Sequence, residues 1–157
     1  MSLLIRNVLF TIVVPGAGAV LGPWWLLTRG GVRPEPAAWY AVVCIAAGAL
    51  LYFACLWEFA TVGRGTPGPW DAPRRFVAVG PYRWVRNPIY ISAFLVVGGE
   101  AWLFLSPTLL VYTLALAVGV HLFVIGYEEP TLRRTFGDTY AQYLRTVPRW
   151  IPRVPSS

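Results

Sequence analysis

Four long apolar runs constrain what this chain can fold into. Three runs carry no charged residue and the fourth contains a single acid, Glu100; they are residues 7–28, 37–57, 107–127 and 89–105. A helix needs about 20 predominantly apolar residues to cross the hydrocarbon core of a bilayer. We therefore expect an all-α polytopic membrane protein with four transmembrane helices in one domain. Only 13% of the residues are charged, about half the share typical of soluble domains, which excludes an ordinary soluble globular protein.

Proline and glycine are expected to bend or connect these helices. Pro15 and Gly16 lie inside the first run, so we expect a kinked or interrupted helix whose freed carbonyls need a partner on a neighbouring helix. Ser106–Pro107 predicts a tight turn, which would join the last two runs into a helical hairpin. We expect Glu100 to hydrogen-bond to the facing helix of this hairpin, near Tyr112.

The thirteen basic residues are all arginines, and they are unevenly distributed. Eleven lie at residue 6, in the segment 63–88 or after residue 128, whereas only Arg29 and Arg33 lie between the first two runs. Since arginine near span ends is retained in the cytoplasm, we expect cytoplasmic termini and a cytoplasmic segment 63–88, in an inner or plasma membrane. The arginines flank membrane helices without a recognition motif, so nucleic acid is not an expected partner. The oligomeric state stays open.

The segment 63–88 is rich in proline and glycine but also carries aromatic residues among its arginines. A disordered linker would be poor in aromatic residues, so we predict an ordered cytoplasmic loop. Tyr82 and Trp84 offer flat apolar faces to a ligand. The same composition fits an interfacial aromatic belt whose arginines contact lipid phosphates, and both interpretations stay open.

Two adjacent acids, Glu128 and Glu129, follow the last uncharged run. The helix dipole disfavours carboxylates at a helix C-terminus, so a cationic partner is expected. That partner is either Arg86, Arg133 or Arg134, or a bound ligand. Because the Glu pair and the loop arginines are expected on one membrane face, they could converge on a small zwitterionic molecule.

After Pro130, apolar residues recur at helical spacing from Leu132 to Val147, with arginines between them. We expect a C-terminal amphipathic helix that lies on the membrane interface and is interrupted or bent at Gly137.

Four motifs in these segments resemble the isoprenylcysteine carboxyl methyltransferase and phospholipid methyltransferase superfamily. Their order along residues 63–152 is that of the superfamily: Arg86-Asn87-Pro88-Ile89-Tyr90, Glu128-Glu129, the Phe-Gly-x-x-Tyr-x-x-Tyr pattern of residues 136–143, and Val147-Pro148. The resemblance implies an integral membrane methyltransferase with the first two spans in residues 1–62. It places the cofactor loop, the helical hairpin and the C-terminal segment in residues 63–157.

The resemblance also implies methyl transfer from S-adenosyl-L-methionine to a lipidic or membrane-embedded acceptor. The acceptor types known for the superfamily are an isoprenylcysteine carboxyl group and a phospholipid amine, and the substrate would reach the site from the bilayer as a lipid or a lipidated molecule. The cofactor pocket implied by the resemblance consists of Phe76, Val77, Tyr82, Arg86, Asn87, Pro88, Ile89, Tyr90, Glu128 and Glu129.

The sequence departs from the superfamily pattern at two positions. Asn87 replaces a histidine and cannot act as a titrating base. Val124 stands where isoprenylcysteine enzymes carry an arginine that holds the substrate carboxylate, which favours an amine, thiol or hydroxyl acceptor. His121, two helical turns before Glu128, is then the candidate catalytic base; its alternative is a helix-packing role. Glu58 is a weaker candidate for a substrate contact, with a loop arginine as its alternative partner.

Two other functions compete with methyl transfer. Sterol-reductase-like membrane oxidoreductases share a Pro-x-Tyr element and bind NADPH, but they are normally longer and lack the Glu pair. A non-catalytic membrane scaffold would bind neither S-adenosylmethionine nor a nicotinamide nucleotide.

Overall fold

The computed structural model describes residues 2–30, 39–67 and 75–154, and every regular element in these ranges is a helix. The expected all-α fold is therefore confirmed for this part of the chain. Arg33 and Arg74, which contribute to the predicted charge asymmetry, lie outside the described residues. The helices, in chain order, are α1 (Leu3–Gly16), η1 (Ala17–Leu21), α2 (Gly22–Gly30), α3 (Trp39–Glu58), η2 (Phe59–Gly63), η4 (Gly80–Arg83), α4 (Pro88–Leu103), α5 (Pro107–Phe123), η5 (Val124–Glu128) and α6 (Glu129–Thr146).

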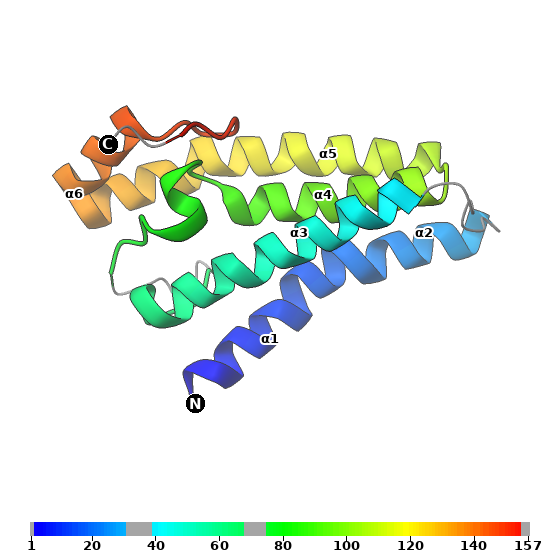
Figure 1. Cartoon of the computed structure of the whole chain (residues 1–157), viewed down its shortest axis with the longest axis horizontal. Coiled ribbons are helices and arrows are strands. Elements are labelled where there is room, and N and C mark those ends of the chain that lie inside the picture. The colour runs from blue at the N-terminus through cyan, green and yellow to red at the C-terminus, as the bar shows by residue number, and fades with distance from the viewer. Residues whose placement is uncertain (1, 31–38, 68–74, 155–157) are drawn as a thin grey trace.

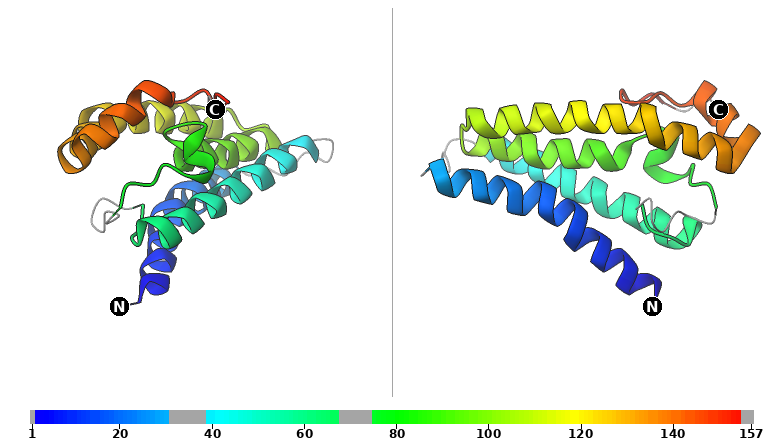
Figure 2. Two further views of the ribbon diagram at one scale, coloured as in Figure 1. Left: turned by 60° about the vertical axis from the view of Figure 1, so that its left-hand side comes forward. Right: turned by 180° about the vertical axis from the view of Figure 1, so that it is seen from behind.

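The long helices run side by side as an elongated bundle, and both ends of the described chain lie at the same end of it (Figure 1). The two further views in Figure 2 show α3 and α4 as neighbours, with α5 beside α4. Close packing of α3 on α4 depends on Gly48, since a Cβ there would lie 2.7 Å from the backbone oxygen of Ser92. The bundle thus packs through small residues, as membrane helices commonly do.

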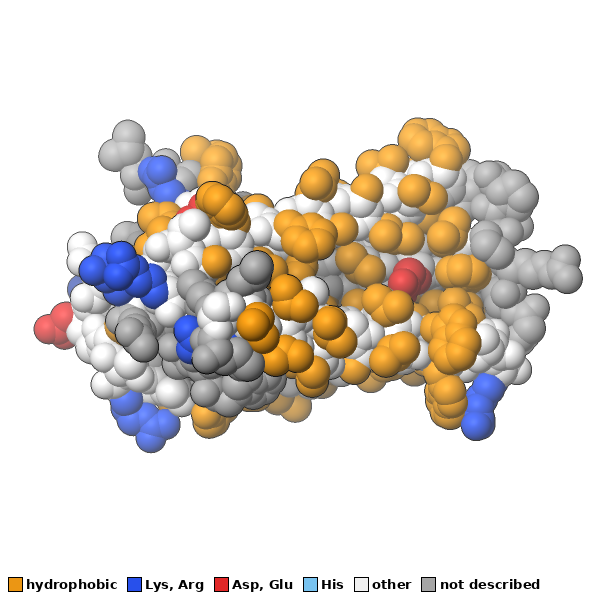
Figure 3. All heavy atoms as spheres, turned by 90° about the horizontal axis from the view of Figure 1, so that it is seen from below, with side chains coloured by type: hydrophobic (Ala, Val, Ile, Leu, Met, Phe, Trp, Pro, Cys, Tyr) orange, Lys and Arg blue, Asp and Glu red, His pale blue; other side chains and the backbone are white. Residues whose placement is uncertain are grey.

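Three helical stretches among the described residues are long and apolar enough to cross a membrane: Ile5–Gly30, Trp39–Gly63 and Pro107–Thr146. The expected third span is the shorter helix α4, whose 16 residues rise about 24 Å. On the face shown in Figure 3, apolar side chains cover most of the middle of the bundle. This apolar exterior is what a bilayer requires of the helices it surrounds.

The first helical stretch bends where the sequence predicted a kink. Pro15 lies near the end of α1, and the following turn, η1, is a π-helix. The carbonyl of Gly18 in that turn accepts a 2.8 Å hydrogen bond from the Tyr112 hydroxyl of α5. We had expected Glu100 to hydrogen-bond near Tyr112. The Tyr112 hydroxyl bonds instead to the first helical stretch. The buried Oε2 of Glu100 has no hydrogen-bond partner among the described residues.

The hairpin of α4 and α5 forms as predicted. The Ser106 hydroxyl caps α5 by accepting from the backbone N–H of Leu109 at 3.3 Å, and Pro107 occupies the first helical position. Beyond α5 the chain continues through η5 directly into α6. Gly137 interrupts α6 with φ 51° and ψ −126°, which confirms the predicted bend.

Candidate functional site

A cavity of about 910 Å³, including its open mouth, lies at the end of the bundle that carries both chain ends. Nine of the residues that line it are aromatic, and they come from η2, the loop before α4, the start of α4, the end of α5, η5 and α6. The lining consists of Phe59, Pro67, Phe76, Val77, Tyr82, Arg86, Asn87, Tyr90, Phe123, Tyr127, Glu128, Glu129, Thr131, Leu132, Phe136, Tyr140 and Tyr143.

The C-terminal segment 147–153, here called the strap, pairs with residues 84–87 beside this cavity. The backbone N–H of Arg86 donates to the Pro148 carbonyl at 2.8 Å, and that of Arg153 donates to the Trp84 carbonyl at 2.9 Å. The Asn87 side chain adds a 3.1 Å hydrogen bond to the Arg149 carbonyl. The strap therefore holds the start of the Arg-Asn-Pro-x-Tyr motif in place.

Glu129 forms an ion-pair cluster with Arg86 and Arg149. Its Oε1 accepts from Arg86 Nη1 and from Arg149 Nε, both at 2.8 Å, and its Oε2 accepts from Arg149 Nη2 at 2.9 Å. The hydrogen bonds to Glu129 raise the pKa of the Arg149 guanidinium above its ordinary value. Of the three arginines that the sequence offered as partners, Arg86 is the one that pairs. The strap residue Arg149 was not foreseen.

Glu128 has a different environment from its neighbour. Its Oε2 accepts a 2.7 Å hydrogen bond from the Tyr90 hydroxyl, the only donor that reaches it among the described residues. Both residues line the cavity. Glu128 thus presents a carboxylate to the cavity that no arginine neutralises by direct pairing, whereas both oxygens of Glu129 are occupied.

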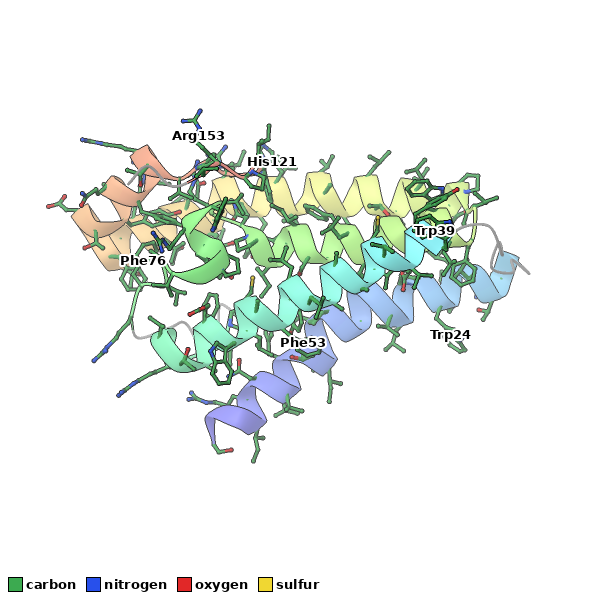
Figure 4. The ribbon with its side chains drawn as sticks, in the orientation of Figure 1. Trp24, Trp39, Phe53, Phe76, His121 and Arg153 are labelled. Atoms are coloured by element: carbon green, nitrogen blue, oxygen red, sulfur yellow. The ribbon has the colours of Figure 1, made fainter. Side chains whose placement is uncertain are left out.

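An aromatic cluster around Phe76 forms another wall of the cavity (Figure 4). The ring of Phe76 lies 5.4, 5.5 and 4.9 Å from the rings of Phe136, Tyr140 and Tyr143, measured between centroids. The Tyr143 hydroxyl donates to the Tyr82 carbonyl at 2.7 Å, and burial raises the pKa of the Tyr82 phenol well above its ordinary value. These contacts join α6 to the loop before α4.

The structure brings together eight of the ten pocket residues that the resemblance implied. Pro88 and Ile89 do not line the cavity: Pro88 is buried at the start of α4, and Ile89 packs against the cluster of Cys55, Val77 and Tyr82. Successive residues of a helix point in different directions, so Tyr90 can face the cavity while Ile89 faces the bundle.

His121 and Glu58 are also absent from the lining. His121 Nδ1 accepts a 3.0 Å hydrogen bond from the indole N–H of Trp150 in the strap. Figure 4 places His121 on α5, nearer the middle of the bundle, and Phe76 toward the end that carries both chain ends. Glu58 packs against the backbone at Gly80, where a Cβ would lie 2.5 Å from its Oε1.

Sequence reasoning missed several lining residues, which are Phe59, Pro67, Phe123, Tyr127, Thr131, Leu132, Phe136, Tyr140 and Tyr143. The aromatic residues of α6 belong to the Phe-Gly-x-x-Tyr-x-x-Tyr motif, which could have predicted them. Phe59 stands in no motif, and only the packing of η2 beside the loop identifies it.

A family model described as phospholipid methyltransferase matches residues 36–139, about two thirds of the chain. The matched region includes the loop before α4, the hairpin and the Glu pair. No curated protein and no solved structure matches the chain significantly.

Proposed function

The chain belongs to the phospholipid methyltransferase family, and from this premise we propose that it transfers a methyl group from S-adenosyl-L-methionine to a lipidic acceptor in the membrane. The observation that carries the proposal is the cavity. Side chains from the Arg-Asn-Pro-x-Tyr motif, the Glu pair and the Phe-Gly-x-x-Tyr-x-x-Tyr motif, far apart in sequence, line the same space.

The chemistry of the lining residues fits this cofactor, which supplies an activated methyl group on a sulfonium. The Glu128 carboxylate can accept from ribose hydroxyls or from the methionyl ammonium. Aromatic faces stabilise a nearby cation by about 0.5–2 kcal/mol, and nine aromatic residues line the cavity. The buried Nε of Arg86 has no hydrogen-bond partner among the described residues, and it can donate to the methionyl carboxylate. Phe76, Val77, Tyr82 and Asn87 would complete the site.

Methyl transfer from a sulfonium is an in-line displacement, so the protein mainly has to align the reactants and exclude water. Alignment of a well-placed pair supplies about 7–11 kcal/mol of the barrier reduction. Phe123 and Tyr127 line the cavity and are 39% and 48% exposed on the outside of the bundle. We place the route of the lipid acceptor beside these two rings, and the route of the cofactor on the cytoplasmic side.

Two positions favour an amine, thiol or hydroxyl acceptor over a carboxylate. Val124 is completely buried and apolar, so it offers no charge to a substrate carboxylate. Asn87 is 6% exposed and donates to the Arg149 carbonyl, which is a structural contact and not that of a base. A phospholipid amine is the acceptor that agrees best with the family description.

The proposed membrane arrangement has four spans, formed by α1–α2, α3, α4 and α5, with both termini and the cavity in the cytoplasm. In Figure 3 the basic side chains gather mainly at one end of the bundle. Arginine is retained on the cytoplasmic side, which supports this orientation in an inner or plasma membrane. Residues 1–157 would form one methyltransferase domain, with α6 lying at the interface.

Calorimetric titration of the detergent-purified protein with S-adenosylhomocysteine tests the proposal. We expect saturable binding that Glu128→Gln weakens at least tenfold, because the substitution removes the cavity carboxylate that pairs with no arginine. Asp138→Asn is the matched control: it removes one exposed acid of α6 that does not line the cavity, and it should leave the affinity unchanged.

Absence of binding by folded wild-type protein would overturn the proposal, and saturable binding of NADPH in its place would favour the reductase. Where S-adenosylhomocysteine binds, transfer of a radiolabelled methyl group into phosphatidylethanolamine vesicles, compared with an isoprenylcysteine analogue, identifies the acceptor class.

A further inference from the structure

We infer that His121 acts as a positioning residue for the cavity through the strap, and not as the catalytic base. The inference rests on the proposed function. It starts from the hydrogen bond in which the Trp150 indole N–H donates to His121 Nδ1 at 3.0 Å.

The direction of this hydrogen bond identifies Nδ1 as the ring nitrogen that accepts. An indole N–H is a donor only, so His121 Nδ1 carries a lone pair and the proton of the neutral ring is on Nε2. A general base needs its free lone pair directed at the proton it removes. In His121 that lone pair is occupied by Trp150, and the residue does not line the cavity.

Trp150 fixes the strap over the hairpin. Its ring lies 6.0 Å from the rings of both Phe94 in α4 and His121 in α5, measured between centroids. The other polar contacts of the strap among the described residues join it to residues 84–87, to Glu129, or to the Tyr143 carbonyl at the end of α6. Within the described ranges, the hydrogen bond to His121 is the one that ties the strap to α5.

The residue next to Trp150 connects this anchor to the cavity. Arg149 holds both oxygens of Glu129, and its carbonyl accepts from Asn87. Release of Trp150 would let Arg149 shift. Glu129, Arg86 and Asn87 would then lose their fixed positions in the cavity wall. His121 thus acts on the cavity at a distance, through two adjacent strap residues.

Three single variants and one double variant test this coupling. His121→Phe removes the acceptor and keeps a ring, and Trp150→Phe removes the donor and keeps a ring. His121→Asn is the rescue variant, because its Oδ1 can accept near the position of Nδ1. The double variant His121→Phe/Trp150→Phe shows whether the two residues act through one contact.

The first readout needs no ligand: the rate of tryptic cleavage after Arg149, followed by mass spectrometry. We expect faster cleavage in both phenylalanine variants, since the strap opens more often, and a rate near that of wild type in His121→Asn. The second readout is the S-adenosylhomocysteine affinity. We expect each phenylalanine variant to weaken it about three- to tenfold, and the double variant to be no weaker than either one.

Wild-type cleavage rates and affinities in the phenylalanine variants would overturn the inference. So would additive losses in the double variant, because additivity means that the two residues act independently. If His121→Phe does not fold, Trp150→Phe and His121→Asn decide the question. A wild-type protein that fails to bind S-adenosylhomocysteine contradicts the proposed function alone, since the cleavage rates still test the contact of His121 with Trp150.

Discussion

Two adjacent carboxylates at the cavity have different tasks. Glu129 is 12% exposed in its side chain and binds two guanidinium groups, whereas Glu128 receives one phenolic hydrogen bond. Neighbouring residues of a helix point about 100° apart, so they meet different partners. The sequence predicted a cationic partner for the pair but could not assign it to one member, because the strap that supplies Arg149 has no periodic pattern.

Glu129→Gln should therefore lower the stability of the ligand-free protein by about 1–3 kcal/mol, because it leaves Arg86 without its ionised partner. Glu128→Gln should change the stability by less than about 0.5 kcal/mol, since the amide can still accept from Tyr90. Thermal unfolding in detergent at neutral pH measures both. Equal losses in the two variants would contradict the division of tasks between them.

The buried phenol of Tyr82 predicts a loss of stability at alkaline pH. Burial raises its folded-state pKa well above the ordinary value of 10.0, so the unfolded chain releases this proton at lower pH than the folded protein does. The protonated Tyr82 phenol therefore stabilises the folded protein fully below pH 10. Above pH 10 this stabilisation falls by about 1.4 kcal/mol for each pH unit.

Tyr82→Phe should make the alkaline decline shallower, because the variant has no proton to release at this site. Unfolding midpoints of wild type and variant between pH 9 and 11 measure the difference. Parallel curves would show that Tyr82 does not supply this pH dependence.

At the scale of the elements, the bend in α6 depends on Gly137. Its φ of 51° and ψ of −126° lie in a backbone region that is strained for every residue except glycine. A Cβ at this position would meet no atom within 4 Å, so steric contact with neighbours plays no part. Gly137→Ala should therefore destabilise the protein by about 1–3 kcal/mol through backbone strain alone.

Gly119→Ala in α5 is the matched control, since a Cβ there also meets nothing within 4 Å but the backbone is helical. It should be neutral or stabilise the protein by about 0.5–1 kcal/mol. Thermal unfolding of the two alanine variants measures both changes in stability, which should be a loss for Gly137→Ala and no loss for Gly119→Ala. A neutral Gly137→Ala would mean that α6 straightens without penalty.

The helical elements were predictable and the strap was not, for a physical reason. Apolar runs and the Ser106–Pro107 turn identify α4 and α5, because burial in lipid requires long uncharged stretches. The strap pairs through the backbone of residues such as Pro148 and Arg153, and backbone groups leave no signature in the side-chain pattern. The family resemblance implied eight of the lining residues, whereas the chain of contacts from His121 through Trp150 and Arg149 to Glu129 is visible only in the structure.

At the scale of the whole molecule, the number of membrane crossings depends on whether the short helix α4 spans the bilayer. The described chain begins and ends at the same end of the bundle, which requires an even number of crossings if every long helix spans the membrane (Figure 1). By length α4 is the weakest span, with 16 residues. It packs between α3 and α5, so its neighbours can hold it across a locally thinned bilayer.

We therefore expect reporters fused after Ser157 and inserted after Gly65 to read as cytoplasmic, and a reporter inserted after Leu105, in the turn between α4 and α5, to read as external. Paired phosphatase and fluorescent-protein fusions measure each site from both sides. External signals after both Gly65 and Ser157 would mean that the four-span arrangement is inverted, whereas an external signal after Ser157 alone would mean an odd number of crossings between the two sites. In the second case the strap would lie across the membrane from residues 84–87, which contradicts their hydrogen bonds and would overturn the four-span arrangement. In the first case only the proposed cytoplasmic position of the cavity would be wrong.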